Sequence, residues 1–548
     1  MISPRLALWS LLTSVTFSFG FVLSAQAQTI EAQSGDRSTN TQVTQTGNQF
    51  DIDGGVTSGD GANLFHNFEQ FGLTAEQVAN FITNPNINNV VGSVLGGASY
   101  IDGTLQITGS AANLYLLNPA GIVFGPNAGL NLDGSFTAAT SGGLGFGDNF
   151  FNAFATQDYS QLTGNPTSFL FTEESAGAIV NEGNLAVDPG QQVTLVGGSV
   201  INTGTLSAPE GGDITIAAVP GENLVRISQE GALLSLTLET LPEDAASGTI
   251  PAGIAATDLP GLLTGAPETM GELAVVVGDD GTVSLTNSGT TLPNEPDFTV
   301  VEGTVDASGT VAGDVTVLGN QVALLDANVN ASGETGGGNI HIGGAFQGGD
   351  SLPAAQYTYI DEAAELAADA LVNGDGGFVV VWADEQTVFN GQISARGGAE
   401  AGDGGFVEVS GRDDLTFAGV VDVGASAGEV GTLLLDPTDI IISSEDSNPV
   451  EVDNIFPASD SEEDITVGVD DFQDQTVTIN AESLSQQTGS IVLQASRNII
   501  IDENIGELEF EPGEGSITFI ADADTFPDIL EERPDPEDAP AANEAGAY

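Results

Sequence analysis

The 548-residue chain has no cysteine, no lysine and only two histidines, His66 and His341. Without cysteine the chain cannot form disulfides, and without a second nearby histidine it lacks the ligand spacing of a zinc site. Two histidines far apart in the sequence give little material for acid–base catalysis, so we interpret each one as a polar strand or loop residue. The sequence therefore predicts no catalytic residue, no metal site and no cofactor, and we do not expect an enzyme.

Positive charge is almost as scarce. All seven basic residues are arginines, whereas aspartate and glutamate number 78, which gives a formal net charge of −71. Binding to nucleic acid depends on clustered basic side chains that replace counterions on the phosphates, so we expect no nucleic-acid partner. Such a charge keeps an extended chain in solution and attracts divalent cations without a specific site.

The N-terminus has the pattern of a secretory leader. Arg5 is followed by an apolar stretch, residues 6–23, and then by Ala25-Gln26-Ala27, a small-x-small cleavage pattern. We predict a signal peptide over residues 1–27 rather than a membrane anchor, because small and polar residues weaken the stretch and no basic stop signal follows it. The lack of cysteine is compatible with export, since a chain without disulfides can cross a membrane unfolded.

Glycine is abundant, with 72 residues, and it separates short β-branched strands. Similar pieces recur: residues 179–185 (IVNEGNL) as 200–206 (VINTGTL), 305–309 (VDASG) as 329–333 (VNASG), and 376–381 (GGFVVV) as 404–409 (GGFVEV). The offsets are 21, 24 and 28 residues. An imperfect period of about 20 to 30 residues is typical of a solenoid whose coils supply strands to stacked sheets. We predict an all-β fold, a parallel β-helix, right-handed because that is the usual crossover.

Composition divides the chain into six segments. Prolines interrupt the strand pattern between residues 238 and 270, and the alanine-rich YIDEAAELAADAL at residues 359–371 is the strongest helix signal. The predicted order is a signal peptide (1–27), a first β-helix block (28–225), an irregular excursion or linker (226–272), β-helix repeats with a short helical insertion near 359–371 (273–437), an acidic connector with further β-repeats (438–524) and a disordered acidic tail (525–548).

Two asparagine–proline segments stand out within the first block. The first is Asn84-Pro85-Asn86-Ile87, and the second is Asn118-Pro119-Ala120-Gly121-Ile122, which lies inside NLYLLNPAGIVFGPNAGLNLDGSF. Asparagine can bond neighbouring backbone groups through its amide, and proline fixes a corner. Both segments therefore predict turns between short strands.

These segments carry a family resemblance. Residues 41–231 resemble the N-terminal two-partner secretion domain of filamentous haemagglutinin, whose two short motifs are usually written NPNL and NPNGI. Here Ile87 replaces the leucine of the first motif, and Ala120 replaces the second asparagine of the second motif. Two looser similarities are to large haemagglutinin-like adhesins: residues 404–437 resemble a stretch common in them, and residues 490–521 resemble their later repeats.

The resemblance implies a secreted haemagglutinin-like exoprotein of a diderm bacterium, and the composition is similar to that of cyanobacterial members. Such a protein passes the periplasm and leaves the cell through an outer-membrane β-barrel transporter with polypeptide-transport-associated domains. It acts as an adhesin or a cell-surface structural protein, with a cell-surface or glycan ligand. Family members are commonly longer, which leaves open a short member or a truncated reading frame.

Several interpretations stay open. The two motifs are either turns that the N-terminal coils need for folding or direct contacts with the transporter. The competing function is an extracellular polysaccharide-active β-helix enzyme, a lyase or glycosidase, in which Arg226, Arg396 or Arg412 would act beside acidic residues. A passive surface-layer component is a third candidate. Asn330-Ala331-Ser332 fits a glycosylation acceptor, but a stacked asparagine at a turn explains it equally well and is the interpretation we favour.

Overall fold

The computed structural model describes residues 29–171, 176–219, 221, 223–226, 237–240, 257–278, 280–293, 296–437, 439–443, 477–480, 484–495, 498–501 and 515–521. The predicted signal peptide, most of the acidic connector and the predicted C-terminal tail lie outside these residues. No helix within the described segments is long and apolar enough to cross a membrane.

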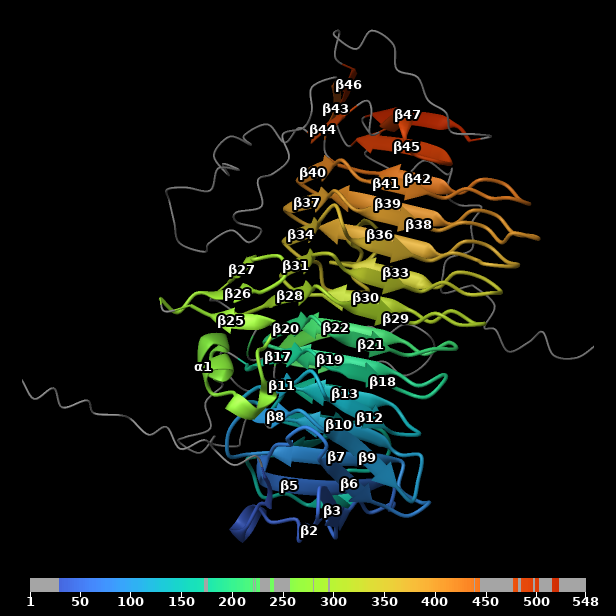
Figure 1. The fold of residues 1–548 in the computed structure, drawn as a ribbon. Coiled ribbons are helices and arrows are strands. Elements are labelled where there is room, and N and C mark those ends of the chain that lie inside the picture. Colours follow the sequence, from blue (N-terminus) through green and yellow to red (C-terminus); the bar gives the residue numbers. More distant parts are fainter. Residues whose placement is uncertain are drawn as a thin grey trace, which may run out of the picture.

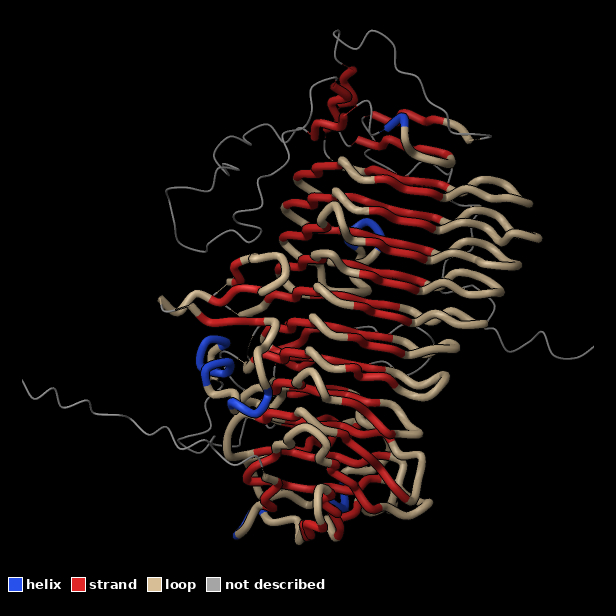
Figure 2. The backbone as a smooth tube through the Cα atoms, viewed as in Figure 1, coloured by secondary structure: helices blue, strands red, loops and turns tan. Residues whose placement is uncertain are grey.

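The chain winds into a β-helix with three long sheets (Figures 1 and 2). Sheet A contains β1 (Ile30–Ala32), β4 (Val56–Thr57), β5 (Asn63–Phe71), β7 (Asn89–Val94), β10 (Asn113–Leu117), β13 (Phe136–Ala139), β19 (Val193–Gly197), β22 (Ile214–Ala218), β30 (Val315–Leu318), β33 (Asn339–Ile342), β36 (Phe378–Ala383), β39 (Phe406–Gly411), β42 (Thr432–Leu435), β45 (Ser490–Ala495) and β47 (Ile517–Ala521).

Sheets B and C form the other two sides of the coil. Sheet B contains β2 (Gln42–Thr46), β3 (Gln49–Asp53), β6 (Val78–Ile82), β9 (Thr104–Thr108), β12 (Gly129–Asn131), β18 (Asn184–Ala186), β21 (Thr205–Ser207), β29 (Thr304–Asp306), β32 (Asn328–Asn330), β35 (Glu365–Ala367), β38 (Gln392–Ser394) and β41 (Val420–Asp422). Sheet C contains β8 (Ser99–Ile101), β11 (Ile122–Phe124), β17 (Ala178–Asn181), β20 (Ser199–Asn202), β28 (Phe298–Val301), β31 (Gln321–Leu324), β34 (Tyr357–Ile360), β37 (Gln386–Phe389), β40 (Asp414–Phe417), β43 (Asp439–Ser443), β44 (Val477–Asn480) and β46 (Asn498–Ile501).

Successive coils pair in parallel, and the sequence repeats mark the register. Ile179 pairs with Val200, Val305 with Val329, and Phe378 with Phe406. The offsets read from the sequence are therefore the lengths of individual coils. The predicted parallel β-helix is confirmed, and alternate side chains of all three sheets point inward into one continuous apolar core.

Two of the three outer faces are partly covered by excursions from the coil. A small sheet of β14 (Gly143–Phe146), β15 (Asn149–Asn152), β16 (Ser168–Leu170), β23 (Asn223–Arg226) and β24 (Thr237–Thr240) accompanies a second apolar cluster with outward residues of sheet A. A third cluster joins outward residues of sheet C to α1 (Leu259–Thr264) and to β25 (Val275–Val277), β26 (Val283–Leu285) and β27 (Thr291–Leu292). Sheet B carries mostly polar outward residues along its described strands, with exceptions such as Val78, Ile82 and Val420. Four short 3-10 turns complete the described elements: η1 (Gly35–Arg37), η2 (Tyr159–Gln161), η3 (Glu268–Met270) and η4 (Phe346–Gly348).

The helical insertion predicted near residues 359–371 is wrong. The structure forms β34, a turn and β35 there. Ile360, Ala364 and Leu366 enter the core, because β34 pairs with β31 and β37 and β35 pairs with β32 and β38. Neighbouring coils on both sides thus override the helix propensity of the alanines. A helix occurs instead at α1, inside the segment predicted as an irregular excursion, where the Asp258 carboxylate accepts the Gly261 N–H at 2.8 Å.

The loop between β33 and β34, residues 343–356, forms a flap that lies against the outer face of sheet A. The Phe346 ring packs against Phe378 and Phe406, with centroids 5.8 and 5.7 Å apart. Beneath it, the fully buried Glu408 carboxylate accepts the Gln347 N–H, and burial raises the pKa of Glu408 to about 8. Asp436 lies near enough to add to this effect, and burial raises its own pKa to about 6.

This carboxyl makes stability depend on pH. Its folded pKa is higher than its unfolded value, so its contribution is complete below about pH 4.5 and is lost as the pH rises toward 8. We expect Glu408→Gln to flatten the fall in unfolding free energy over this range, by up to about 1.4 kcal/mol per pH unit. Urea unfolding of the mature protein at several pH values, followed by Trp382 fluorescence, measures this. Glu365→Gln, an exposed site, is the control, and equal pH slopes for wild type and Glu408→Gln would contradict the assignment.

Candidate functional site

The second asparagine–proline motif is a buried corner between β10 and β11. The Asn118 side chain is fully buried, and its Nδ2 donates to the Gly97 carbonyl at 2.8 Å and to Ser99 Oγ at 2.9 Å. Its Oδ1 accepts the Ala120 N–H at 3.0 Å. One amide thus closes its own turn and joins it to the preceding coil.

The rest of this motif lies beneath α1. Gly121 has φ +113°, and a Cβ there would lie 3.0 Å from a Leu262 methyl group. The Ala120 carbonyl accepts the Thr257 N–H at 3.2 Å, and the Ala120 side chain is buried. The small alanine at this position, where the family motif has asparagine, therefore fits a corner that is enclosed by the covering segment.

The first motif is an exposed corner between β6 and β7. Asn84 Oδ1 accepts the Asn86 N–H at 3.0 Å, and the Asn84 carbonyl accepts the Ile87 N–H at 3.0 Å. Asn84, Pro85 and Asn86 are exposed, whereas the Ile87 side chain belongs to the core. The result is a rigid turn that is anchored from inside and accessible from outside.

The structure does not bring the two motifs together. The first motif precedes β7, the second follows β10, and these neighbouring strands pair from Asn89 with Asn113 onward. The motifs therefore lie at opposite ends of two neighbouring strands of sheet A, separated by the length of a strand. Both segments form the turns expected of them, with Ile122 buried as the first residue of β11, but one turn is exposed and the other is buried.

An asparagine ladder beside the first motif was not predicted. Asn89 Nδ2 donates to Asn63 Oδ1 at 2.8 Å, and Asn113 Nδ2 donates to Asn89 Oδ1 at 3.0 Å. Asn63 Nδ2 in turn donates to the carbonyls of Leu162 and Gly164, both at 2.9 Å. The sequence signal was an asparagine at the first residue of three successive strands of sheet A, β5, β7 and β10. Stacked amides of this kind fix the register of the first coils.

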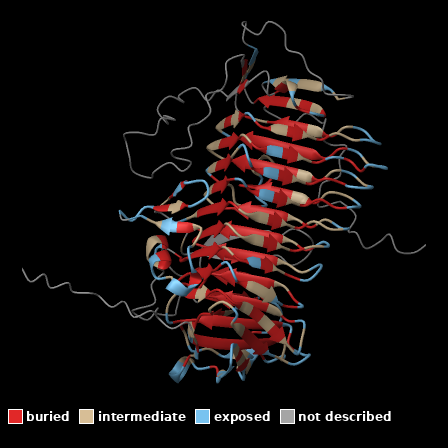
Figure 3. Ribbon diagram, in the orientation of Figure 1, coloured by how far each residue is buried: buried red, intermediate tan, exposed pale blue. Residues whose placement is uncertain are grey.

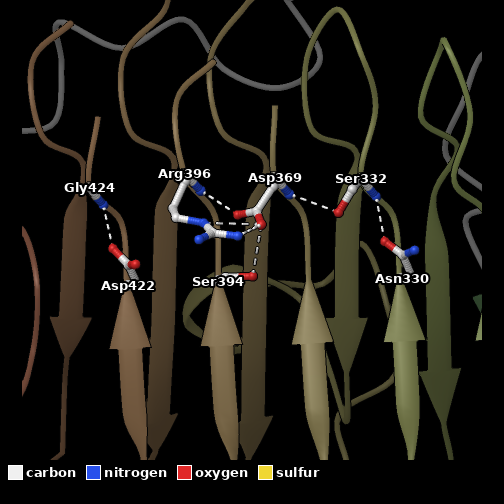
Figure 4. A network of polar contacts seen from close by, with 7 residues as sticks. All are labelled: Asn330, Ser332, Asp369, Ser394, Arg396, Asp422 and Gly424. Atoms are coloured by element: carbon white, nitrogen blue, oxygen red, sulfur yellow. Dashed lines mark hydrogen bonds and ion pairs between the residues drawn. The ribbon is translucent and has the colours of Figure 1, made fainter. Parts of the chain in front are cut away.

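The other sequence candidates have structural roles. His66 and His341 are buried, which lowers the pKa of each to about 4 and leaves both neutral at physiological pH. Asn181 Nδ2 donates to Asn202 Oδ1 at 2.7 Å, and Asn330 Oδ1 accepts the Ser332 N–H at 3.0 Å. The stacked asparagine expected from the repeats is thus present at Asn181, and Asn330 closes a turn (Figure 4).

Two of the arginines considered for a lyase site form ion pairs. Arg396 Nη2 lies 2.6 Å from Asp369 Oδ2, and Arg412 Nη2 lies 2.9 Å from Asp384 Oδ1. Arg396 lies two residues after the end of β38 in sheet B, whereas Arg412 directly follows β39 in sheet A, so the two arginines follow strands of different sheets. Among the described residues, no group of three or more histidine or carboxylate side chains is placed to hold a metal ion.

Comparison with protein families matches residues 28–250 to the TPS secretion domain. This part of the chain is a TPS secretion domain. The chain is therefore a two-partner secretion exoprotein: the TPS secretion domain implies export from the cell and an outer-membrane transporter as its partner. The two motifs both lie within the TPS secretion domain, and the match extends past the predicted boundary at residue 225 to residue 250.

Two solved structures are similar to this chain. The HMW1 secretion domain from Haemophilus influenzae has 22% identity and a TM-score of 0.37, covering 74% of this chain and 99% of that one. The filamentous hemagglutinin secretion domain has 16% identity and a TM-score of 0.28, covering 74% of this chain and 100% of that one. No curated protein matches this chain.

The different burial of the two motifs predicts different costs of mutation. Asn118→Ala removes three buried hydrogen bonds and leaves their partners unsatisfied, so we expect a loss of about 2–4 kcal/mol in unfolding free energy. Asn84→Ala removes one bond in an exposed turn, for which we expect less than about 1 kcal/mol. Urea unfolding of the purified mature variants measures both values. Similar losses for the two variants would show that burial does not separate the motifs.

Proposed function

We propose that the mature chain crosses the periplasm and acts outside the cell as an adhesin or surface structural protein, and that its two motifs serve export differently. The exposed turn Asn84-Pro85-Asn86 contacts the transporter. The buried corner at Asn118 acts through folding. The observation that carries this proposal is the opposite exposure of the two motifs within one TPS secretion domain.

Contact with the transporter is supported by the geometry of the first motif. Three consecutive side chains are exposed, and the two turn bonds together with the buried Ile87 hold them in one conformation. A rigid exposed turn loses little conformational entropy when it is bound.

A folding role is supported by the contacts of the second motif. Asn118 joins its own coil to the preceding coil through Gly97 and Ser99, and its backbone N–H bonds the Ala139 carbonyl of the following coil at 3.0 Å. A chain that emerges from a pore adds one coil at a time, so a residue that bonds both neighbouring coils favours continued stacking outside the membrane.

An adhesive or structural role is supported by the architecture beyond the TPS secretion domain. From β29 onward the coils continue as a rod whose sheet B has a polar outer face that no described element covers, and loops project from one edge (Figure 3). The enzyme alternative is less favoured, because Arg396 and Arg412 already pair with carboxylates and follow strands of different sheets, β38 and β39.

Export of motif variants tests the proposal. In cells that carry the transporter, we expect Asn84→Ala and Pro85→Ala to reduce protein in the medium several-fold, while the unfolding free energy of the purified variants stays within about 1 kcal/mol of wild type. Asn118→Ala should reduce both quantities.

Pro126→Ala is the matched control, because Pro126 is an exposed proline at another corner of the same domain. Its export should match wild type. Normal export of Asn84→Ala and Pro85→Ala would contradict direct contact, and normal export of a destabilised Asn118→Ala would contradict the folding role.

A further inference from the structure

An open groove of about 500 Å³ lies over sheet B, beyond the TPS secretion domain. Its floor is formed by β32 and β35, where Asn328 pairs with Glu365 and Asn330 pairs with Ala367. Ala367 is the smallest residue in a row that continues as Asp306, Asn330, Ser394 and Asp422. The missing side-chain volume at Ala367 deepens the floor.

The wall of the groove comes from loops that lead from sheet B to sheet A. It includes Glu210, Thr310, Glu334 and Leu371. Isolated bridges join these loops, from Gly309 to Gly333 and from Gly333 to Ala370. The groove therefore does not depend on a single loop for its shape.

Hydrogen bonds within and behind the wall hold it in position. Thr310 donates its N–H to the Glu210 carboxylate at 3.1 Å. Ser332 Oγ accepts the Asp369 N–H at 3.2 Å (Figure 4). Asp369 also pairs with Arg396 and accepts from Ser394 Oγ at 3.1 Å. Binding to such a preorganised site requires little ordering of the protein.

The lining combines polar and aliphatic groups. Hydroxyls, amides and carboxylates face the groove beside Leu371, whose side chain is 52% exposed. The side chains of Asn328 and Glu365 are exposed, and within the described part of the chain neither is engaged in a side-chain hydrogen bond. Several fixed polar groups beside an apolar surface are the composition of a site for an amphipathic polar ligand.

We propose that this groove binds an uncharged oligosaccharide. Sugar hydroxyls supply the donors that the carboxylate and amide oxygens accept, and hydrogen bonds to charged acceptors are the stronger ones. The apolar face of a sugar ring covers Leu371. Anionic glycans are excluded, because Glu210, Glu334 and Glu365 line the groove, no basic side chain does, and the chain carries a net charge of −71.

This inference rests on the proposed adhesive function and names its ligand class. Because the groove is open, a polymer can extend out of it along the rod. Since the groove is formed by residues 210–371, mainly downstream of the matched domain, binding and export use different surfaces of one molecule.

Calorimetry with the full mature chain tests the site, using cellotetraose and mannotetraose as uncharged probes and tetragalacturonate as the anionic probe. We expect at least one uncharged tetrasaccharide to bind and tetragalacturonate not to bind. Asn328→Ala should weaken binding about tenfold, which corresponds to about 1.4 kcal/mol. Glu365→Gln keeps an acceptor oxygen but removes the charge. It should lower the affinity for the uncharged tetrasaccharides several-fold and reduce the discrimination against tetragalacturonate.

Asn184→Ala is the matched control. Asn184 occupies the same ladder position as Asn328, through Thr205 and Thr304, and is also exposed, but it lies outside the groove. The affinity of Asn184→Ala for the uncharged tetrasaccharides should match that of wild type. The assignment is overturned if no uncharged probe binds, if tetragalacturonate binds as well, or if Asn328→Ala and Asn184→Ala behave alike.

Adherence of secreted protein to cells separates this inference from the proposed function. If wild type adheres to cells and Asn328→Ala adheres equally, the groove is not the binding site, but the adhesive function stands. If wild type is secreted but does not adhere to cells or surfaces, the adhesive function itself fails.

Discussion

Parallel pairing between successive coils is the interaction on which the rest of this structure depends. A strand in sheet A, B or C bonds the coil before it and the coil after it, so each coil is stable only between its neighbours. The three sheets meet around one apolar core, which forbids a slip of register because a shift by one residue would turn the inward side chains outward. Excursions are therefore confined to the corners, where α1, the flap and the projecting loops occur.

The large negative charge is compatible with this stacking because many carboxylates accept backbone N–H groups from the next coil. Asp375 accepts the N–H of Asp403, and Asp403 accepts the N–H of Glu429, both at 2.7 Å. Asp213 and Asp314 act in the same way directly before β22 and β30 of sheet A. Glycine allows the loops to approach closely, as at Gly402, where a Cβ would lie 1.8 Å from the Gly374 carbonyl oxygen. The scarcity of basic residues thus leaves acids paired mainly with backbone donors and amides.

The three faces of the rod have different environments. Sheets A and C have apolar outward residues that meet the excursions, and this is where buried groups such as Asn118 and Glu408 lie. The outer face of sheet B is mostly polar, no described element covers it, and the groove lies on it. One coil can therefore pack against the excursions on sheets A and C and present ligand-binding groups on sheet B.

The sequence by itself determined the repeat. Short strands, glycine punctuation and recurrences such as residues 305–309 with 329–333 were enough to predict a parallel β-helix, because strand periodicity and turns are local properties. The turns at Asn84 and Asn118 were also local, and both occur. Tertiary structure alone decided which motif is exposed, that Asn63, Asn89 and Asn113 form a ladder, and that residues 359–371 form strands instead of a helix. The physical reason is the same in each case: burial and register come from neighbouring coils, which lie tens of residues away in the sequence.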